Sequence, residues 1–210
     1  MRLGARAALI SVWVAGFLPV LVPPVMAQDA RGLVGRWRSV QTSQGGIGAM
    51  YEFRADGTMR FSPGAIVDMP YRLEGNQLVL PPATTNGPEQ KSTIEWTGND
   101  VFRMTAGGQA AGPYRRQGRQ QDSGNPLVGE WLGSQQMDGR NLEMRFIFDA
   151  SGSCEMLIKF TTQQGKYSAI GKRLVAQING ATALDGTFAI SDSVLTIQRS
   201  GGRTTTLKRY

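Results

Sequence analysis

Leu33-Val34-Gly35-Arg36-Trp37 occurs again 94 residues later as Leu127-Val128-Gly129-Glu130-Trp131. The match continues downstream, because Phe53-Arg54-Ala55-Asp56-Gly57 returns as Phe148-Asp149-Ala150-Ser151-Gly152, and the offset stays between 93 and 96 along the two copies. A chance alignment would need several coincidences in the same order. The sequence therefore predicts two tandem copies of one unit, over residues 31–116 and 127–210.

Apolar residues in both copies recur at every second position, which is the period of a β-strand. Turn residues separate these segments, as in Ala55-Asp56-Gly57 and Thr97-Gly98-Asn99, and suit tight hairpins. In the first copy the pattern predicts strands near 34–41, 48–54, 57–62, 69–74, 77–81, 91–97, 100–106 and 112–116. The second copy predicts a matching set near 128–136, 141–148, 153–160, 165–170, 173–178, 184–190, 193–199 and 203–209.

Eight strands joined by short turns form an up-and-down meander, which leaves two exposed edges unless its first and last strands pair. We therefore expect an all-β fold of two tandem eight-stranded antiparallel up-and-down barrels, one in each copy. The segment 117–126 is polar, ends in proline and is predicted to be the linker between them. The alternative is one larger sheet or sandwich shared by both copies.

Residues 1–27 have the features of a cleaved secretory signal peptide. Arg2 and Arg6 precede an acid-free apolar run over 7–22, and Val25-Met26-Ala27 offers short residues at a cleavage site. An uncleaved anchor is the less favoured alternative, because the run falls short of the roughly 18 to 20 residues that span a bilayer. We expect a secreted or periplasmic protein that does not insert into a membrane after cleavage.

Composition excludes several kinds of chemistry. Histidine is absent, so neither a Ser-His-Asp triad nor a zinc site with histidine ligands can be assembled. Cys154 is the single cysteine and alternates with Met156 and Ile158, which predicts a buried core thiol rather than a disulfide. Without Arg2 and Arg6 the chain keeps 21 basic and 16 acidic residues, spread along its length, so no nucleic-acid partner is expected.

Catalytic groups are not brought together by any motif of the sequence. The acids Glu52, Asp56 and Glu95 lie in turns or at outward positions of strands, and no run of carboxylates suits calcium. The glycine-rich loop 45–48 has no following helix with which to bind phosphate. We therefore expect no catalytic residue, no metal, no cofactor and no enzyme activity. An isomerase or cyclase that uses Tyr71 or Tyr167 stays open as an alternative.

The Gly-x-Trp at the start of each copy and an arginine in its last strand resemble the lipocalin and wider calycin pattern. The elements are Gly35-Arg36-Trp37 with Arg116, and Gly129-Glu130-Trp131 with Arg209. The resemblance implies tandem small lipocalin-like (calycin-type) β-barrel domains of a secreted bacterial protein. It also implies that Trp37, Arg116, Trp131 and Arg209 close the barrel ends. A guanidinium stacked on an indole contributes about 0.5 to 2 kcal/mol.

Inward positions of the alternating strands are predicted to line each barrel. In the first copy they are Phe53, Met59, Phe61, Leu78, Leu80, Ile94, Trp96, Phe102 and Met104. In the second copy they are Met144, Phe146, Phe148, Met156, Ile158, Leu174, Phe188, Ile190, Leu195 and Ile197. Either these side chains fill the interiors, or one interior stays partly open for a small apolar ligand. In the open case the expected ligand contacts are Phe53, Phe61, Trp96, Met104, Phe146, Phe148 and Phe188.

These observations predict an exported, non-enzymatic, lipocalin-like protein whose expected partner is a small apolar ligand. The alternative is a protein-interaction module or inhibitor of the cell envelope that acts through barrel-rim loops near 42–49, 63–68 and 82–90. The sequence does not identify a protein partner for that role.

Overall fold

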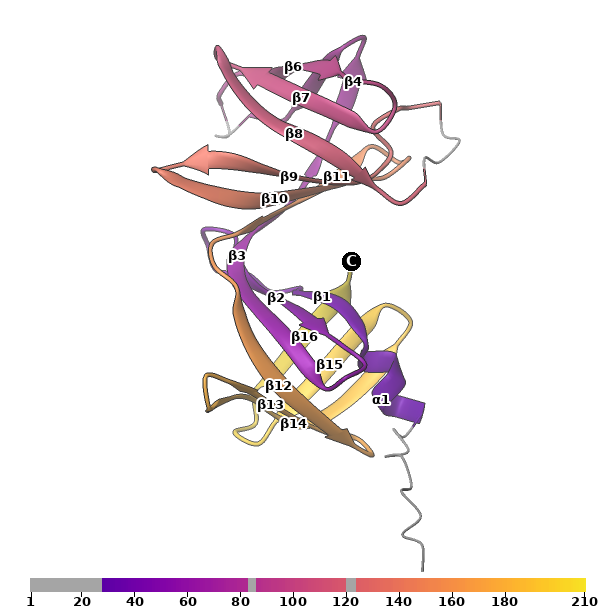
Figure 1. Ribbon diagram of the computed structural model, residues 1–210, viewed down its shortest axis with the longest axis vertical. Coiled ribbons are helices and arrows are strands. Elements are labelled where there is room, and N and C mark those ends of the chain that lie inside the picture. The colour runs from indigo at the N-terminus through magenta and orange to yellow at the C-terminus, as the bar shows by residue number, and fades with distance from the viewer. Residues whose placement is uncertain (1–27, 83–85, 120–123) are drawn as a thin grey trace, which may run out of the picture.

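The computed structural model describes residues 28–82, 86–119 and 124–210 and consists almost entirely of β-strands (Figure 1). The predicted signal peptide, residues 1–27, lies outside the described residues. A short helix that the sequence did not predict, α1 (Gln28–Leu33), precedes the first strand. The prediction of an all-β protein is confirmed.

Most strands begin and end close to the predicted segments, except the third, which was predicted to end near residue 62 and continues to Pro70, and all neighbouring pairs are antiparallel. From the first predicted copy come β1 (Gly35–Ser39), β2 (Ile47–Phe53), β3 (Thr58–Pro70), β4 (Arg72–Glu74), β5 (Gln77–Leu80), β6 (Gln90–Trp96), β7 (Val101–Ala106) and β8 (Gln109–Gln117). From the second come β9 (Gly129–Met137), β10 (Arg140–Phe148), β11 (Ser153–Lys159), β12 (Gln163–Ile170), β13 (Arg173–Ile178), β14 (Ala181–Ser191), β15 (Val194–Arg199) and β16 (Thr204–Arg209).

Eight strands close into an antiparallel barrel, which we call the closed barrel. Its strand order is β12-β13-β14-β15-β16-β1-β2-β3, and pairing between β12 and β3 completes the ring. Strands β1 and β16, from opposite ends of the described chain, pair with Trp37 opposite Arg209. The prediction of an eight-stranded antiparallel barrel is confirmed for this unit.

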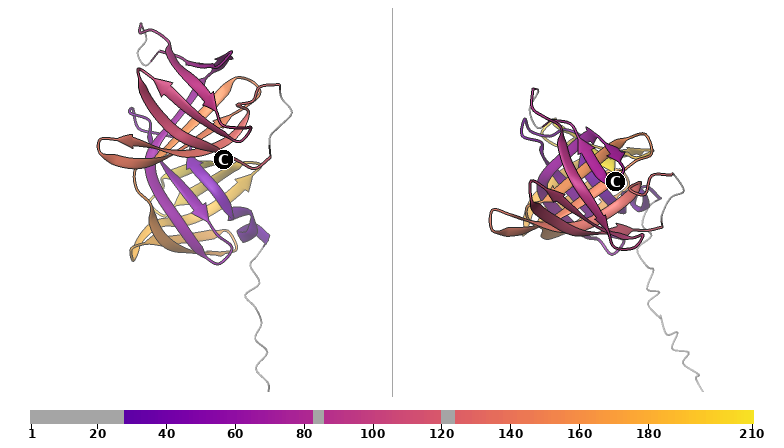
Figure 2. Two further views of the ribbon diagram at one scale, coloured as in Figure 1. Left: turned by 45° about the horizontal axis from the view of Figure 1, so that its top comes forward. Right: turned by 90° about the horizontal axis from the view of Figure 1, so that it is seen from above.

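The strands β4 to β11 form a second lobe, which lies above the closed barrel in Figure 1. Each pairs with the next along the chain, and β11 also pairs with β3, from Ser153 opposite Pro70 to Lys159 opposite Gly64. The long strand β3 therefore belongs to both units, because its start pairs with β12 and its end pairs with β11. The views in Figure 2 show β3 running from one lobe into the other.

Strand pairing does not follow the boundary between the predicted copies. The closed barrel takes β1, β2 and the start of β3 from the first copy and β12 to β16 from the second. The expectation that each copy forms its own barrel is therefore wrong, and the alternative of a sheet shared by both copies describes the pairing. The predicted linker 117–126 is also misassigned, because it connects β8 to β9, which are hydrogen-bonded neighbours inside the second lobe.

The segment 63–68, predicted as a loop, is the middle of β3 and carries the chain between the lobes. Its proline and glycine resemble a turn, but the extended backbone from Gly64 onward finds its hydrogen bonds on β11. Glycine fits here because an added Cβ would overlap the Ile158 carbonyl oxygen and lie 2.7 Å from Met50 Cε. Close packing of two backbones thus replaces the expected reversal of the chain.

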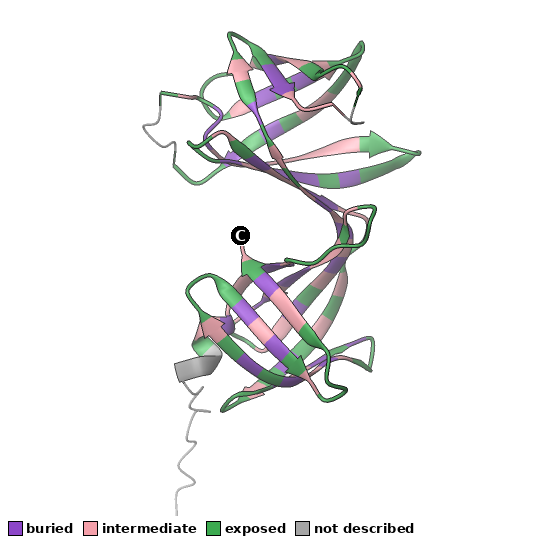
Figure 3. Cartoon of the chain, turned by 180° about the vertical axis from the view of Figure 1, so that it is seen from behind, coloured by how far each residue is buried: buried purple, intermediate pink, exposed green. Residues whose placement is uncertain are grey.

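Each lobe has its own apolar core. Buried and exposed residues alternate along most strands (Figure 3), as a sheet with one face turned inward requires. One cluster of buried side chains fills the closed barrel and includes Trp37, Phe53 and Leu207. A second cluster fills much of the second lobe and includes Phe102, Trp131 and Phe148.

Candidate functional site

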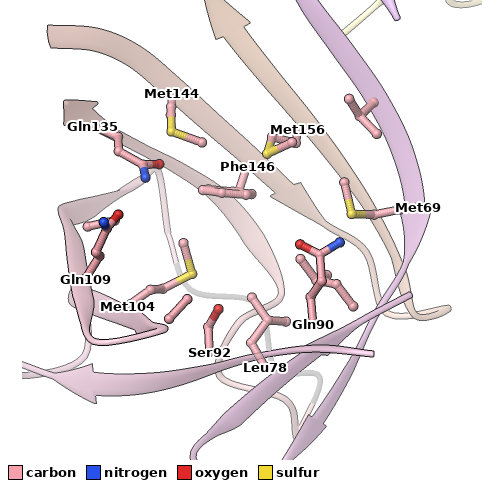
Figure 4. Close-up of a pocket in the computed structure, with 14 residues that line it drawn as sticks. Met69, Leu78, Gln90, Ser92, Met104, Gln109, Gln135, Met144, Phe146 and Met156 are labelled. Carbon is pink, nitrogen blue, oxygen red and sulfur yellow. The ribbon is translucent and has the colours of Figure 1, made fainter. Parts of the chain in front are cut away.

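A cavity of about 360 Å³ lies inside the second lobe (Figure 4). It is bounded by side chains from eight strands, β3 and β5 to β11, and it is partly open to solvent, because Gln90, Ala106 and Gln109 of its lining are exposed. Its lining residues are Val67, Met69, Leu78, Leu80, Gln90, Ser92, Met104, Ala106, Gln109, Ala111, Gln135, Met144, Phe146 and Met156. The volume is within the range of roughly 300 to 1,000 Å³ that small-molecule sites occupy.

Four methionines supply much of the apolar lining: Met69, Met104, Met144 and Met156. In Figure 4 they come from different sides of the cavity and surround Phe146. Methionine is unbranched and has a polarizable thioether, so its side chain adapts to ligands of different shape. The apolar part of the wall is therefore adaptable in shape.

Neutral polar side chains form the rest of the wall. Gln109 and Gln135 lie on one side of the cavity in Figure 4, Gln90 lies on the other, and Ser92 lies below Phe146. The Gln90 amide donates a hydrogen bond to the Pro81 carbonyl oxygen, 3.1 Å away. Within the described part of the chain, the Ser92, Gln109 and Gln135 side chains form no hydrogen bond. Ser92 and Gln135 are half-buried, whereas Gln109 is exposed to solvent.

The predicted ligand contacts divide between the two lobes. Met104 and Phe146 line the cavity, whereas Trp96 and Phe148 pack in the core of the same lobe. Phe53, Phe61 and Phe188 belong instead to the core of the closed barrel. There the Tyr51 ring lies 5.3 Å from Phe61 and Phe53 lies 5.0 Å from Tyr167, as in a packed aromatic interior. Three of the seven predicted contacts therefore lie in the other lobe from the cavity.

Sequence reasoning missed the polar part of the wall. Only apolar side chains were predicted to line the interiors, because polar residues in an alternating strand usually face water. The strand parity contained a signal, since Gln90 and Ser92 share a face with the inward Ile94, and Gln135 shares one with Trp131. Met69 was missed for another reason, because the preceding residues were predicted to form a loop.

The two Gly-x-Trp stretches have the same surroundings, one in each lobe. Trp37 Nε1 donates to the Leu33 carbonyl oxygen at 2.8 Å, and the Arg209 guanidinium carbon lies 4.2 Å from the centre of the indole. At Gly35, with φ of 138°, an added Cβ would collide with that guanidinium. The glycine of the motif thus leaves room for the arginine that stacks on the tryptophan.

In the second lobe the equivalent group is Trp131 with Arg116. Trp131 Nε1 donates to the Leu127 carbonyl oxygen at 2.7 Å, and the Arg116 guanidinium carbon lies 4.1 Å from the ring centre. Arg116 also donates to the Val128 carbonyl oxygen at 2.8 Å and to Asp100 Oδ1 at 3.0 Å. The predicted partners were Trp37 with Arg116 and Trp131 with Arg209, and that assignment is wrong because β1, which carries Trp37, pairs with β16 and not with β8.

Both candidate catalytic tyrosines hold turns at the ends of strands. The Tyr71 hydroxyl donates to the Asp149 carbonyl oxygen at 2.9 Å, and the Tyr167 hydroxyl donates to the Arg54 carbonyl oxygen at 2.6 Å. Burial raises the pKa of both phenols. Neither tyrosine lines the cavity.

Buried ionic groups connect the two lobes. Glu130 on β9 accepts hydrogen bonds of 2.8 and 3.0 Å from Arg36 on β1 and is also ion-paired with the buried Arg145. Burial, followed by repulsion from Arg36, lowers the pKa of Arg145 to about 10. On the same face of β1, Arg38 donates to both oxygens of Asp68 at 3.0 and 3.1 Å and is ion-paired with Glu155 on β11. These ion pairs fix β1 against strands that belong to the second lobe.

Cys154 is buried in the core of the second lobe, as its alternation with apolar residues predicts. Burial raises the pKa of its thiol to about 12, and the carboxylates of Glu155 and Asp149 act in the same direction. Over the described ranges, no three acidic or cysteine side chains converge as a metal site would require. No helix in this same part of the chain is long and apolar enough to cross a membrane.

Fold and site together define an all-β protein with a closed eight-stranded antiparallel barrel and, in a second lobe, a cavity large enough for a small molecule. No protein-family model, curated protein or solved structure matches the chain.

Proposed function

We propose that this is an exported, non-enzymatic binding protein of lipocalin-like character that carries a small apolar molecule in the cavity of the second lobe. The observation that supports this most directly is the cavity itself, whose lining comes from eight strands and is mainly apolar. The strand β3 pairs with β11 and runs on through Tyr71 into β4, which pairs with β5. On this proposal the strands around the cavity form a second, smaller barrel, and duplication of one unit followed by exchange of its first strands produced both.

The two Gly-x-Trp stretches and their stacked arginines also support the proposed carrier function. Each seals one lobe with an indole, a stacked guanidinium and backbone carbonyl acceptors, and neither takes part in the cavity wall. A sealed end and a hollow interior are what a carrier of apolar molecules needs, because the ligand must be shielded from water.

Cavity filling tests the proposal. Ala111 lines the cavity on β8, whereas its neighbour Ala110 is exposed on the opposite face of the same strand. The wild-type protein should increase the fluorescence of the uncharged hydrophobic dye N-phenylnaphthylamine, and Ala111→Phe should lose at least tenfold in affinity. Ala110→Phe should bind as the wild type does.

Native mass spectrometry of protein purified from its own host gives an independent measurement. A retained ligand should appear as added mass in the wild type and disappear in Ala111→Phe. A bare wild-type spectrum together with no dye binding would refute the carrier function.

The competing hypothesis of an envelope interaction module relied on three loops. One of them, 63–68, is part of β3 and is paired on both sides, because Ala65 lies opposite Ile47 of β2 and opposite Ile158 of β11, and the Ile66 amide donates to the Gly46 carbonyl oxygen at 2.9 Å. This segment therefore does not offer the free loop that the hypothesis requires.

A further inference from the structure

We infer that the cavity selects an uncharged amphiphile of about ten non-hydrogen atoms, with a neutral hydrogen-bonding group, and discriminates against fatty acids and alkylammonium ions. The inference rests on the proposed carrier function and names the class of ligand. Its basis is the chemistry of the 14 lining residues, of which ten are apolar, four are neutral and polar, and none is charged.

Size sets the first limit. A cavity of about 360 Å³ holds on the order of ten non-hydrogen groups, at roughly 30 Å³ for each, which is the volume of a water molecule in the liquid. Medium-length chains fit this volume, whereas a long-chain lipid would extend beyond the cavity.

Charge sets the second limit. An ionised carboxylate that leaves water needs a cation or several hydrogen-bond donors around it, and a buried ammonium needs a carboxylate. The lining provides neither kind of counter-charge. A charged headgroup that lies between the half-buried side chains of Ser92 and Gln135 would therefore lose part of its hydration without an equivalent replacement.

The polar side chains explain why the ligand is not a plain hydrocarbon. Ser92, Gln109 and Gln135 contribute one hydroxyl and two amides, which can donate and accept hydrogen bonds at once. A hydrocarbon would displace water from these groups and leave them unpaired, which is unfavourable. An alcohol, amide or ester supplies the missing donor or acceptor and keeps its alkyl part against the methionines.

The test compares four probes with the same ten-carbon chain: decanol, decanoate, decylammonium and decane. Displacement of the bound dye at neutral pH should give decanol an affinity at least tenfold higher than decanoate or decylammonium, and higher than decane. If decanoate or decylammonium binds within threefold of decanol, the inference is wrong while the carrier function stands. If no probe binds, and the dye does not bind either, both proposals fail.

A charge placed in the wall should reverse the selection. Gln135 lines the cavity on β9, and Gln136 is exposed on the other face of that strand, so the two positions form a matched pair. Gln135→Arg should bind decanoate at least tenfold more tightly than the wild type does, whereas Gln136→Arg should leave the ranking of the probes unchanged. Equal preference of both variants for decanoate would show that attraction at the surface, and not the cavity wall, decides the ranking, and would overturn the inference.

Discussion

A double-mutant cycle can decide which arginine stacks on which tryptophan. The perturbations are Trp37→Phe and Arg209→Met, measured singly and together, because these residues are in contact within the closed barrel. The crossed cycle combines Trp37→Phe with Arg116→Met, the partner that lies in the same predicted copy. A barrel built from one copy alone would couple the crossed pair instead.

The expected magnitudes follow from the geometry. The Arg209 guanidinium carbon lies 4.2 Å from the centre of the Trp37 ring, which is fully buried. A desolvated cation–π contact of this kind contributes about 2 kcal/mol, and phenylalanine retains part of it, so the coupling energy should be about 1 kcal/mol. Arg209→Met alone should cost about 3 kcal/mol, because hydrogen bonds of 2.9 and 2.6 Å to the Val34 and Gly32 carbonyl oxygens are lost as well.

Urea unfolding followed by far-UV circular dichroism measures these energies by linear extrapolation, provided that the variants unfold with the wild-type m-value. The crossed cycle should show coupling within about 0.5 kcal/mol of zero, because the two groups lie in different lobes and share no partner. A coupling of about 1 kcal/mol in the crossed pair, with none between Trp37 and Arg209, would refute the exchange of strands between the copies.

Three further predictions concern the junction and the core. Gly64→Ala should lower the free energy of unfolding in urea by about 2 kcal/mol, because its Cβ would overlap the Ile158 carbonyl oxygen. Gly201 has open space around it, so Gly201→Ala should change that energy by less than about 0.5 kcal/mol. Equal effects of the two substitutions would contradict the close approach of β3 and β11 at Gly64. Glu130→Gln should lower the free energy of unfolding by about 3 kcal/mol in the same assay, because Arg36 and Arg145 lose their carboxylate partner in a largely buried site. Glu143 is more exposed, so Glu143→Gln should lower that energy by less than about 1 kcal/mol. An unchanged free energy of unfolding in Glu130→Gln would show that this ion pair does not stabilise the contact between the lobes. Burial raises the pKa of the Cys154 thiol from 9.0 to about 12, so its thiolate fraction at pH 8 should be about a thousandfold lower than that of a free thiol. Cys154 should therefore react with a disulfide reagent only after the protein unfolds. Rapid labelling of the native protein would contradict its burial.

The strands were predictable because local patterns determine them. Alternation over Cys154, Met156 and Ile158 predicted β11, and Gly57 and Gly98 adopt φ values of 80° and 73° at the turns where hairpins were expected. These signals act over a few residues and do not depend on which strand becomes the neighbour.

The choice of neighbours could not be predicted in the same way. If the copies arose by duplication, Trp37 meets an equivalent arginine whether it pairs with the last strand of its own copy or of the other. The deciding element is the segment after Pro63, which either turns back or continues straight. Its backbone contact with β11 is a long-range property, and nothing within a few residues of Gly64 encodes it.

Only part of the apolar lining of the cavity was predictable from the sequence. Met104 and Phe146 followed from strand parity, and Met144 and Met156 were among the expected inward residues. Gln109 and Gln135 share the inward face but look like solvent-facing residues when they are judged by polarity alone. Polar residues that line a cavity are set apart by the space in front of them, which the sequence does not describe.

The exchange of strands separates the stability of the molecule from its cavity. The second lobe is one continuous segment, and it leaves and rejoins the closed barrel through strands β3 and β11, which are paired from Gly64 opposite Lys159 onward. The closed barrel is completed elsewhere, by β1 with β16 and by β3 with β12. On the proposed function, the methionine-lined wall would adjust to a ligand without breaking either of those pairings. Because the aromatic core around Phe53 and Tyr167 lies wholly in the closed barrel, a ligand in the second lobe would leave that packing intact.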